Sequence, residues 1–170
     1  MEYYNIILQF QDELQRDIYD IDQLIKKDKK HIETMIDTST KKLNSIEPTA
    51  ALTMSLESLN DLISQHNINL TEKESTERIL EMSKTVLYVY RQEPDIDDVN
   101  PTAKILKNLN NVIEHITINI QDNLKFYKNH DLKHPNLFTK HDTDISIQIS
   151  ELKTYVQAKK KLERLIEKNE

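Results

Sequence analysis

The chain of 170 residues contains no glycine and no cysteine. An average composition would give about a dozen glycines, and they serve loops that need a positive φ or a close backbone approach. Dinucleotide-binding and Walker-type phosphate loops, the nucleophile elbow of hydrolases and the calcium-binding hand all depend on such glycines. The lack of cysteine excludes disulfides, thiol nucleophiles and cysteine-ligated metals, and it favours a reducing compartment. We therefore predict a protein that is not an enzyme, with no catalytic residues and no cofactor.

Long apolar runs are missing as well. No stretch approaches the roughly 18 consecutive apolar residues that a membrane span requires, and Met1–Tyr4 has no basic segment of the kind that precedes a secretory signal. Residues 1–100 carry 11 basic and 20 acidic side chains, and residues 101–170 carry 12 and 9. Because basic and acidic residues are interspersed, nucleic acid is not expected as a partner. These features predict a soluble intracellular protein, cytoplasmic or nuclear.

The N-terminal region carries apolar residues at helical spacing. Between Tyr3 and Ile46 these positions fall within roughly 80° of one another at 100° per residue. They are Ile7, Phe10, Leu14, Ile18, Ile21, Ile25, Ile32, Ile36, Leu43 and Ile46. Several recur every eleven residues, which favours a nearly straight seam over a heptad zipper. One helix over this region would span about 65 Å, whereas a compact globule of this size is about 40 Å across, so we expect an elongated molecule.

Two shorter helices are expected next. Pro48 ends or redirects the first helix, because it lacks an amide hydrogen and disfavours α geometry in the residue before it. A second helix carries the leucines of Leu52–Leu62, and Asn67–Asn69 is expected to break it. Thr71 followed by Glu74 is typical of a capping box, so a third helix would begin there.

A linker and a fourth helix are predicted after residue 92. Residues 93–100 hold four acids and have a proline close to each end, which is typical of a stiff extended segment. Asn100 as N-cap and Pro101 at the first helical position would open the fourth helix. Pro135 would end this helix near His130.

A last helix is predicted from about Thr143 to the C-terminus, capped by Asp142 or Thr143. Ile145, Ile147 and Ile149 alternate with polar residues, which is also a strand pattern. A lone strand would have no partner in this chain, so the helix is favoured.

These elements predict an all-α fold. We expect an elongated bundle of about five helices, with a long N-terminal helix and coiled-coil-like packing. Residues 1–170 would form a single helical domain; the alternative is a subdivision into 1–92 and 101–170, joined by the acidic linker 93–100.

Two polar clusters are candidate sites. His130, His134 and His141 could suit a metal, but Pro135 pushes His134 out of α geometry, so the first pair would not share a helix face and we predict no metal site. A second cluster lies in the linker, which lacks the features of a calcium loop. A solvated linker is the favoured interpretation, and docking of a basic partner is the alternative. The candidate docking residues are Asp95, Asp97 and Asp98.

Six apolar residues lie off the main stripes of their helices. The first two are eleven residues apart on the face opposite the N-terminal stripe, and three others form a second row on the last helix. The six are Leu8, Tyr19, Ile118, Ile147, Ala158 and Leu165. Rows of this kind indicate a second buried face, packed either within the bundle or on another chain. They form the candidate partner interface.

The leading functional hypothesis is a scaffold or adaptor subunit of a multiprotein assembly, such as a kinetochore, tethering, cytoskeletal or coactivator complex. It would join protein partners by helix-to-helix contact, as a hetero- or homo-oligomer. The alternative is a small stand-alone regulatory or inhibitory binding protein, from a virus or mobile element, that occludes a target protein.

Overall fold

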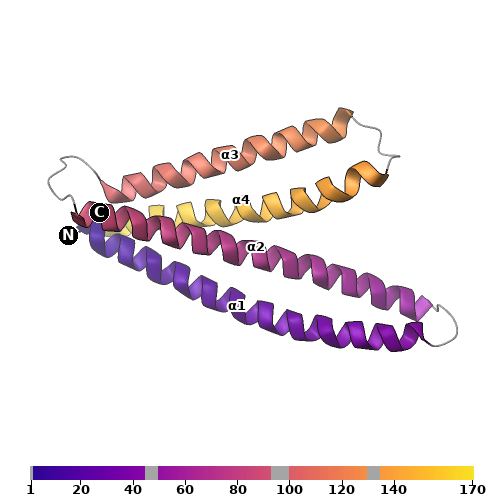
Figure 1. The fold of residues 1–170 in the computed structure, drawn as a ribbon. Helices are drawn as coiled ribbons and strands as arrows, with labels where there is room; N and C mark the ends of the chain where they lie inside the picture. Colours follow the sequence, from indigo (N-terminus) through magenta and orange to yellow (C-terminus); the bar gives the residue numbers. More distant parts are fainter. Residues whose placement is uncertain (1, 45–49, 93–99, 130–134) are drawn as a thin grey trace.

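The computed structural model describes residues 2–44, 50–92, 100–129 and 135–170. These residues form four helices and no strand, which confirms the all-α prediction with four helices in place of five. The helices are α1 (Glu2–Leu43), α2 (Ala50–Gln92), α3 (Pro101–Asn129) and α4 (Pro135–Asn169). Figure 1 shows α1 and α2 as one antiparallel hairpin and α3 and α4 as a second, with the two ends of the chain close together. Pro48, which was predicted to end or redirect the first helix, and residues 93–99 of the predicted linker lie outside the described residues.

The long N-terminal helix is confirmed. α1 has 42 residues, so it runs about 63 Å. Glu2 lies in its first turn, and Lys41 and Lys42 lie in its last, the signs that the helix dipole favours at each end. The predicted stripe is buried at Phe10 but exposed at Ile36, so the bundle does not cover its full length.

The predicted break at Asn67–Asn69 is wrong, because α2 continues through it. Asn69 is buried, its Nδ2 donates to Asp28 Oδ2 of α1 at 3.0 Å, and its Oδ1 accepts from Gln65 at 3.1 Å. The Thr71 hydroxyl donates to the carbonyl of Asn67 at 3.0 Å, one turn back, and so does not cap a new helix. The asparagine side chains are satisfied inside the helix and across the hairpin, which removes the local reason for a break.

The start of the last helix was also predicted wrongly. α4 begins at Pro135, eight residues before Thr143. Pro135 does follow the end of α3, as predicted, but it also occupies the first position of the next helix, where the missing amide hydrogen costs nothing. The strand alternative for Ile145–Ile149 is wrong, since these residues are helical.

The start of α3 agrees with the prediction. The Asn100 Oδ1 accepts hydrogen bonds from the backbone N–H groups of Thr102 at 3.0 Å and Ala103 at 3.2 Å. This is N-cap geometry, and Pro101 fills the first helical position.

The hydrophobic core lies at the end of the molecule where the chain termini meet. All four helices contribute to one cluster of buried side chains, with Phe10, Leu109 and Leu162 fully enclosed. We call this part, residues 2–23, 69–92, 100–117 and 150–170, the closed half. Toward the other end the two hairpins diverge (Figure 1). We call residues 24–44, 50–68, 118–129 and 135–149 the open half.

In the closed half, α2 and α4 bury small polar side chains, which we call the small-residue seam: Ser75 and Ser83 of α2 and Thr154 of α4. Small residues allow helix backbones to approach closely. Their hydroxyls are satisfied locally: Ser83 donates to the carbonyl of Leu80 at 2.7 Å and Thr154 to that of Ser150 at 2.9 Å. The seam therefore packs tightly without leaving these polar groups unpaired.

Candidate functional site

The candidate site is the groove between α2 and α4 where the hairpins part, which we call the inter-hairpin groove. Its outer part has a volume of about 390 Å³ and its inner part about 330 Å³. The wall from α2 consists of Asn60, Ile63, Ser64, Gln65, Asn67, Ile68 and Glu72. The wall from α4 consists of Ser146, Ile147, Ile149, Ser150, Lys153, Thr154 and Gln157.

Helical periodicity explains why these residues share one groove. On α2 the positions 60, 63, 64, 67 and 68 recur every three or four residues, and on α4 the positions 146, 149, 150, 153 and 154 do the same, so each set occupies one helix face. The Ser150 hydroxyl donates to the carbonyl of Ile68 at 3.4 Å. This contact links α2 to α4 within the inner part of the groove.

The groove is lined mainly by uncharged side chains. Isoleucines from both helices supply apolar surface, and amides and hydroxyls such as Asn60, Asn67 and Ser146 supply hydrogen-bonding groups. The two charged residues in the lining, Glu72 and Lys153, have opposite signs and belong to the inner part. The site therefore offers apolar contact and neutral hydrogen bonding without net charge.

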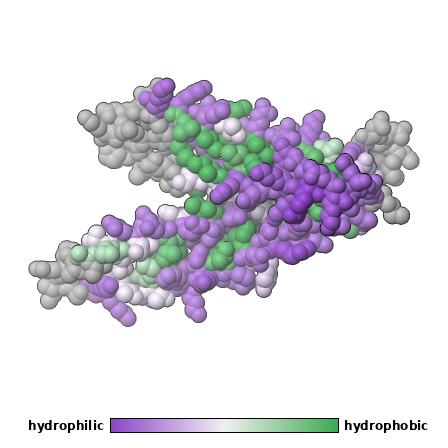
Figure 2. All heavy atoms as spheres, turned by 180° about the vertical axis from the view of Figure 1, so that it is seen from behind, coloured by the Kyte–Doolittle hydropathy of each residue, from purple (hydrophilic) through white to green (hydrophobic). Residues whose placement is uncertain are grey.

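Large apolar side chains are exposed on all four helices of the open half. Nine of them are Leu24, Ile36, Leu43, Met54, Leu56, Ile63, Ile118, Leu124 and Ile149. Among the open-half side chains that the structure describes, Ile25 and Ser39 are the buried ones. Figure 2 shows from behind that the two arms stand apart at their free ends, with hydrophobic side chains along the notch between them. Exposed aliphatic surface of this extent is typical of contact sites for other proteins.

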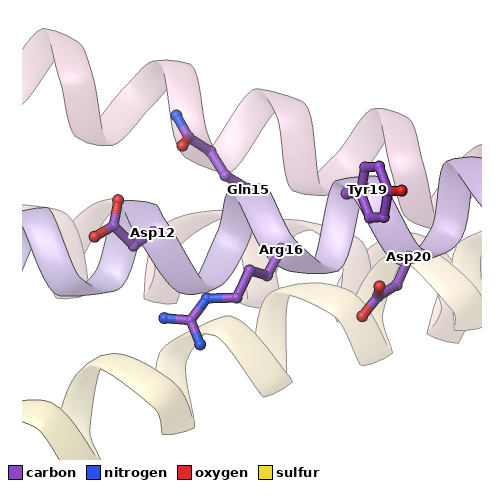
Figure 3. A pocket seen from close by; sticks show the side chains of 5 residues that line it. All are labelled: Asp12, Gln15, Arg16, Tyr19 and Asp20. Carbon is purple, nitrogen blue, oxygen red and sulfur yellow. The ribbon is translucent and has the colours of Figure 1, made fainter.

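A second hollow, of about 390 Å³, lies on the outer face of α1. Figure 3 shows that its lining side chains project from a single helix and do not converge on one point. They are Asp12, Gln15, Arg16, Tyr19 and Asp20. Without an opposing wall, this surface can offer a partner an aromatic ring and charges of both signs, but it does not enclose a small molecule.

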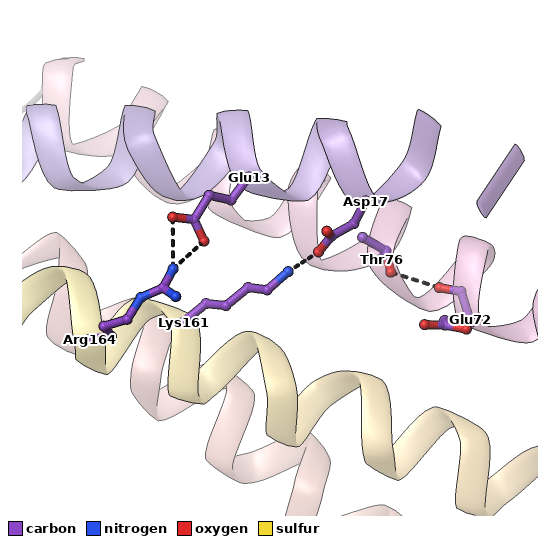
Figure 4. Close-up of polar contacts among 6 residues, drawn as sticks. All are labelled: Glu13, Asp17, Glu72, Thr76, Lys161 and Arg164. Atoms are coloured by element: carbon purple, nitrogen blue, oxygen red, sulfur yellow. Dashed lines mark hydrogen bonds and ion pairs between the residues drawn. The ribbon is translucent and has the colours of Figure 1, made fainter. Parts of the chain in front are cut away.

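Ion pairs fix α4 against α1 in the closed half. Arg164 contacts both carboxylate oxygens of Glu13, at 2.7 and 2.9 Å, and Lys161 pairs with Asp17 (Figure 4). The nearby Thr76 hydroxyl of α2 donates to the backbone carbonyl of Glu72 at 2.7 Å. These basic residues near the C-terminus therefore have partners inside the bundle.

Three titratable groups have shifted pKa values. Hydrogen bonds from Lys73 at 2.8 Å and Lys26 at 3.0 Å lower the pKa of the Asp22 carboxyl, and Asp22 in turn raises the pKa of Lys73. Burial raises the pKa of the Tyr155 hydroxyl, with the Arg78 charge opposing that shift. Asp22 and Lys73 link α1 to α2 at the border between the two halves, and Tyr155 belongs to the core, so these shifts have structural causes.

The six residues of the candidate partner interface lie in three different environments. Leu8, Tyr19 and Ile118 are exposed on the surfaces of α1 and α3, with Tyr19 at 65%. Ile147 lines the inter-hairpin groove. Ala158 and Leu165 are only 3% and 4% exposed and belong to the core, so the packing within the bundle accounts for their row on α4. The structure does not bring the six together on one surface.

The other predicted clusters cannot be placed. Asp95, Asp97, Asp98, His130 and His134 lie outside the described residues, as do the side chains of residues 135–144, including His141. Within the described part of the chain, no group of three or more histidine, aspartate or glutamate residues could hold a metal ion. No helix in that part is long and apolar enough to cross a membrane.

Sequence reasoning missed the groove because it treated Asn67–Asn69 as a loop. A usable signal was present: residues 50–71 contain only Glu57 and Asp61 as charged side chains, in a chain that is 31% charged. The scarcity of charge distinguishes this stretch of helix from the rest of the chain.

No known protein family, no curated protein and no solved structure matches this chain. The function is therefore inferred from the geometry and chemistry of the inter-hairpin groove and of the exposed open half.

Proposed function

We propose that this protein is a non-catalytic scaffold or adaptor subunit that binds other proteins by helix-to-helix contact along its open half. The observation that supports this most directly is the exposure of aliphatic side chains on the diverging arms, including Met54, Leu56 and Ile63. Complete burial of a fully exposed side chain of this kind stabilises by roughly 1.5–3 kcal/mol. The surface that is still exposed on these side chains can contribute part of that free energy to partner binding. Partner helices would lie along the arms with coiled-coil-like interdigitation, inside the cytoplasm or nucleus.

The absence of glycine and cysteine supports a non-catalytic role, since it removes the loops and nucleophiles of several enzyme classes. The groove points the same way, because its lining is dominated by amides, hydroxyls and isoleucines. Acid–base catalysis generally requires titratable groups held close to a reacting atom.

The experiment is affinity purification of the tagged full chain from its native host, compared with two double variants. Met54→Asp with Leu56→Asp places charges on the open half, and Tyr88→Asp with Val89→Asp places them at exposed positions of the same helix in the closed half. The proposal expects a stoichiometric protein partner that the first variant loses and the second retains. Circular dichroism melts should stay close to wild type for both, since all four positions are exposed. A partner that survives the first variant would contradict the proposal.

The alternative, a stand-alone regulatory or inhibitory protein, is supported by a different observation. The closed half has a core assembled from all four helices of one chain, which favours folding without a partner. Purified in isolation, a subunit should self-associate through its open half, whereas a regulator should be a monodisperse monomer. Light scattering coupled to gel filtration separates the two.

The outer face of α1, which carries Leu8 and Tyr19, is tested separately as a partner interface, because the α2 variants leave this face unchanged. Leu8→Asp with Tyr19→Asp should leave folding intact, since both side chains are exposed. If this pair also leaves partner capture unchanged, the outer face of α1 is not an interface.

A further inference from the structure

The inter-hairpin groove is long enough to contact about three turns of one more helix. Its α2 wall runs from Asn60 to Glu72 and its α4 wall from Ser146 to Gln157, so each wall is about 17 Å long. α2 and α4 run in the same direction and part toward their N-terminal ends (Figure 1). A helix of three or more turns laid between them would contact both walls, which is how amphipathic helices bind in apolar grooves.

The chemistry of the lining restricts what the groove can bind. Ile63, Ile68 and Ile147 favour aliphatic side chains. The amides and hydroxyls between them need hydrogen-bonding partners once water is displaced. An ionised side chain buried against this lining would find no opposite charge in the outer part, and an unpaired buried charge is strongly unfavourable.

We infer that the inter-hairpin groove binds an amphipathic helix of another protein, with an aliphatic contact face flanked by serine, threonine, asparagine or glutamine. This inference rests on the proposed function and specifies the partner. The neutral polar rim and the isoleucine surface together define the complementary helix face.

The exposed faces of α1 and α3 of a second copy of this chain fit the groove less well. Leu24 of α1 lies one turn from Asp20 and Lys27, and Ile118 of α3 lies one turn from Glu114 and Asp122. Laid in the groove, either face would bring those charges against the neutral lining. Two copies also each carry a net charge of −6, which opposes their association at low ionic strength.

The test is selection from a display library of amphipathic helices of about five turns (~18 residues). The contact positions are isoleucine or leucine, and the flanking positions are randomised over Ser, Thr, Asn, Gln, Asp, Glu, Lys and Arg. The full chain is the bait. Counter-selection uses Ile63→Asp and Ser146→Arg, which place a charge in the groove at positions outside the core. Val89→Asp, at an exposed aliphatic position of α2 in the closed half, is the matched control bait.

We expect selected helices to bind wild type and Val89→Asp equally and to lose on the order of tenfold or more affinity for Ile63→Asp and Ser146→Arg. Charged residues should be depleted from their flanking positions. The inference is overturned if no helix is enriched over the two groove variants, or if charged flanks are enriched. It is also overturned if the chain dimerises in sedimentation runs and Ser146→Arg abolishes the dimer, since a second copy would then occupy the groove.

The two proposals can fail separately. If the native partner is lost with Met54→Asp and Leu56→Asp but kept with Ser146→Arg, the scaffold function stands and the groove is not its binding site. If no protein is captured and yet the library selects neutral-flanked helices, the groove binds helices but the assembly role is wrong.

Discussion

The closed half and the open half are built from the same four helices and similar aliphatic side chains, yet they differ in how many helices surround each residue. In the closed half, Phe10 is fully buried in a core to which all four helices contribute, whereas Ile36, farther along the same stripe of α1, is 44% exposed. The sequence pattern around the two residues is alike. Burial along α1 therefore follows whether all four helices pack together at that level of the bundle.

The largest expected effect is on Phe10. Phe10→Ala should lower the free energy of unfolding by about 3–5 kcal/mol, because it removes a large side chain and leaves a cavity in the core. Ile36→Ala, on the same helix and stripe, should cost less than about 1 kcal/mol, because the wild-type side chain is half exposed. Urea denaturation followed by circular dichroism measures both. Equal losses would mean that the open half is closed in solution.

The next effect tests the small-residue packing of the closed half. Ser83→Leu should cost about 1–3 kcal/mol, because a larger side chain at a fully buried position overpacks the core. Thr85→Leu, an exposed position two residues away, should change stability by no more than about 0.5 kcal/mol. Thermal melts of the two variants make the comparison. If Ser83→Leu has the same stability as wild type, the packing around Ser83 is loose enough to accept a leucine side chain.

Much of the fold followed from periodicity and caps. α1 and the Asn100 cap were predictable because their signals are local: a long apolar stripe and a side chain that satisfies its own helix. The break at Asn67–Asn69 was predicted wrongly because Asn69 is held by Asp28, a residue 41 positions away, and no local pattern reports that bond. Pro135 misled because the same residue can follow one helix and begin the next.

The candidate site was less accessible from sequence than the fold. Off-stripe apolar residues identified Ile147, which lines the groove, but the same criterion also selected Ala158 and Leu165, which are buried in the core. Periodicity shows that a helix has a second apolar face, but only tertiary packing decides whether another helix of the chain covers it.

A smaller effect is expected at the Asn100 cap, which belongs to the closed half but acts locally. Asn100→Ala should lower the free energy of unfolding by about 1 kcal/mol, because the backbone N–H groups of Thr102 and Ala103 lose their acceptor. Asn110→Ala, at an exposed position inside α3, should be neutral or stabilising, because alanine has the higher helix propensity. Chemical denaturation of the pair separates capping from propensity. An equal response at both positions would mean that the cap contributes nothing.

The smallest effect is the pH dependence of the Asp22–Lys73 pair at the border between the halves. The folded-state pKa of Asp22 lies below its ordinary value, so its stabilisation is present above about pH 3.9, the usual unfolded pKa, and is lost as the pH falls through the folded pKa. The stability difference between wild type and Asp22→Asn should therefore be greatest near neutral pH and shrink on acidification. Asp20→Asn, on the same helix, is the control. The raised pKa of Lys73 acts at the other limit, with stabilisation present below about pH 10.4 and lost as the pH rises through the folded pKa. If the free energy of unfolding of Asp22→Asn changes with pH across the acid range as that of wild type does, the Asp22–Lys73 pair does not stabilise the contact between α1 and α2.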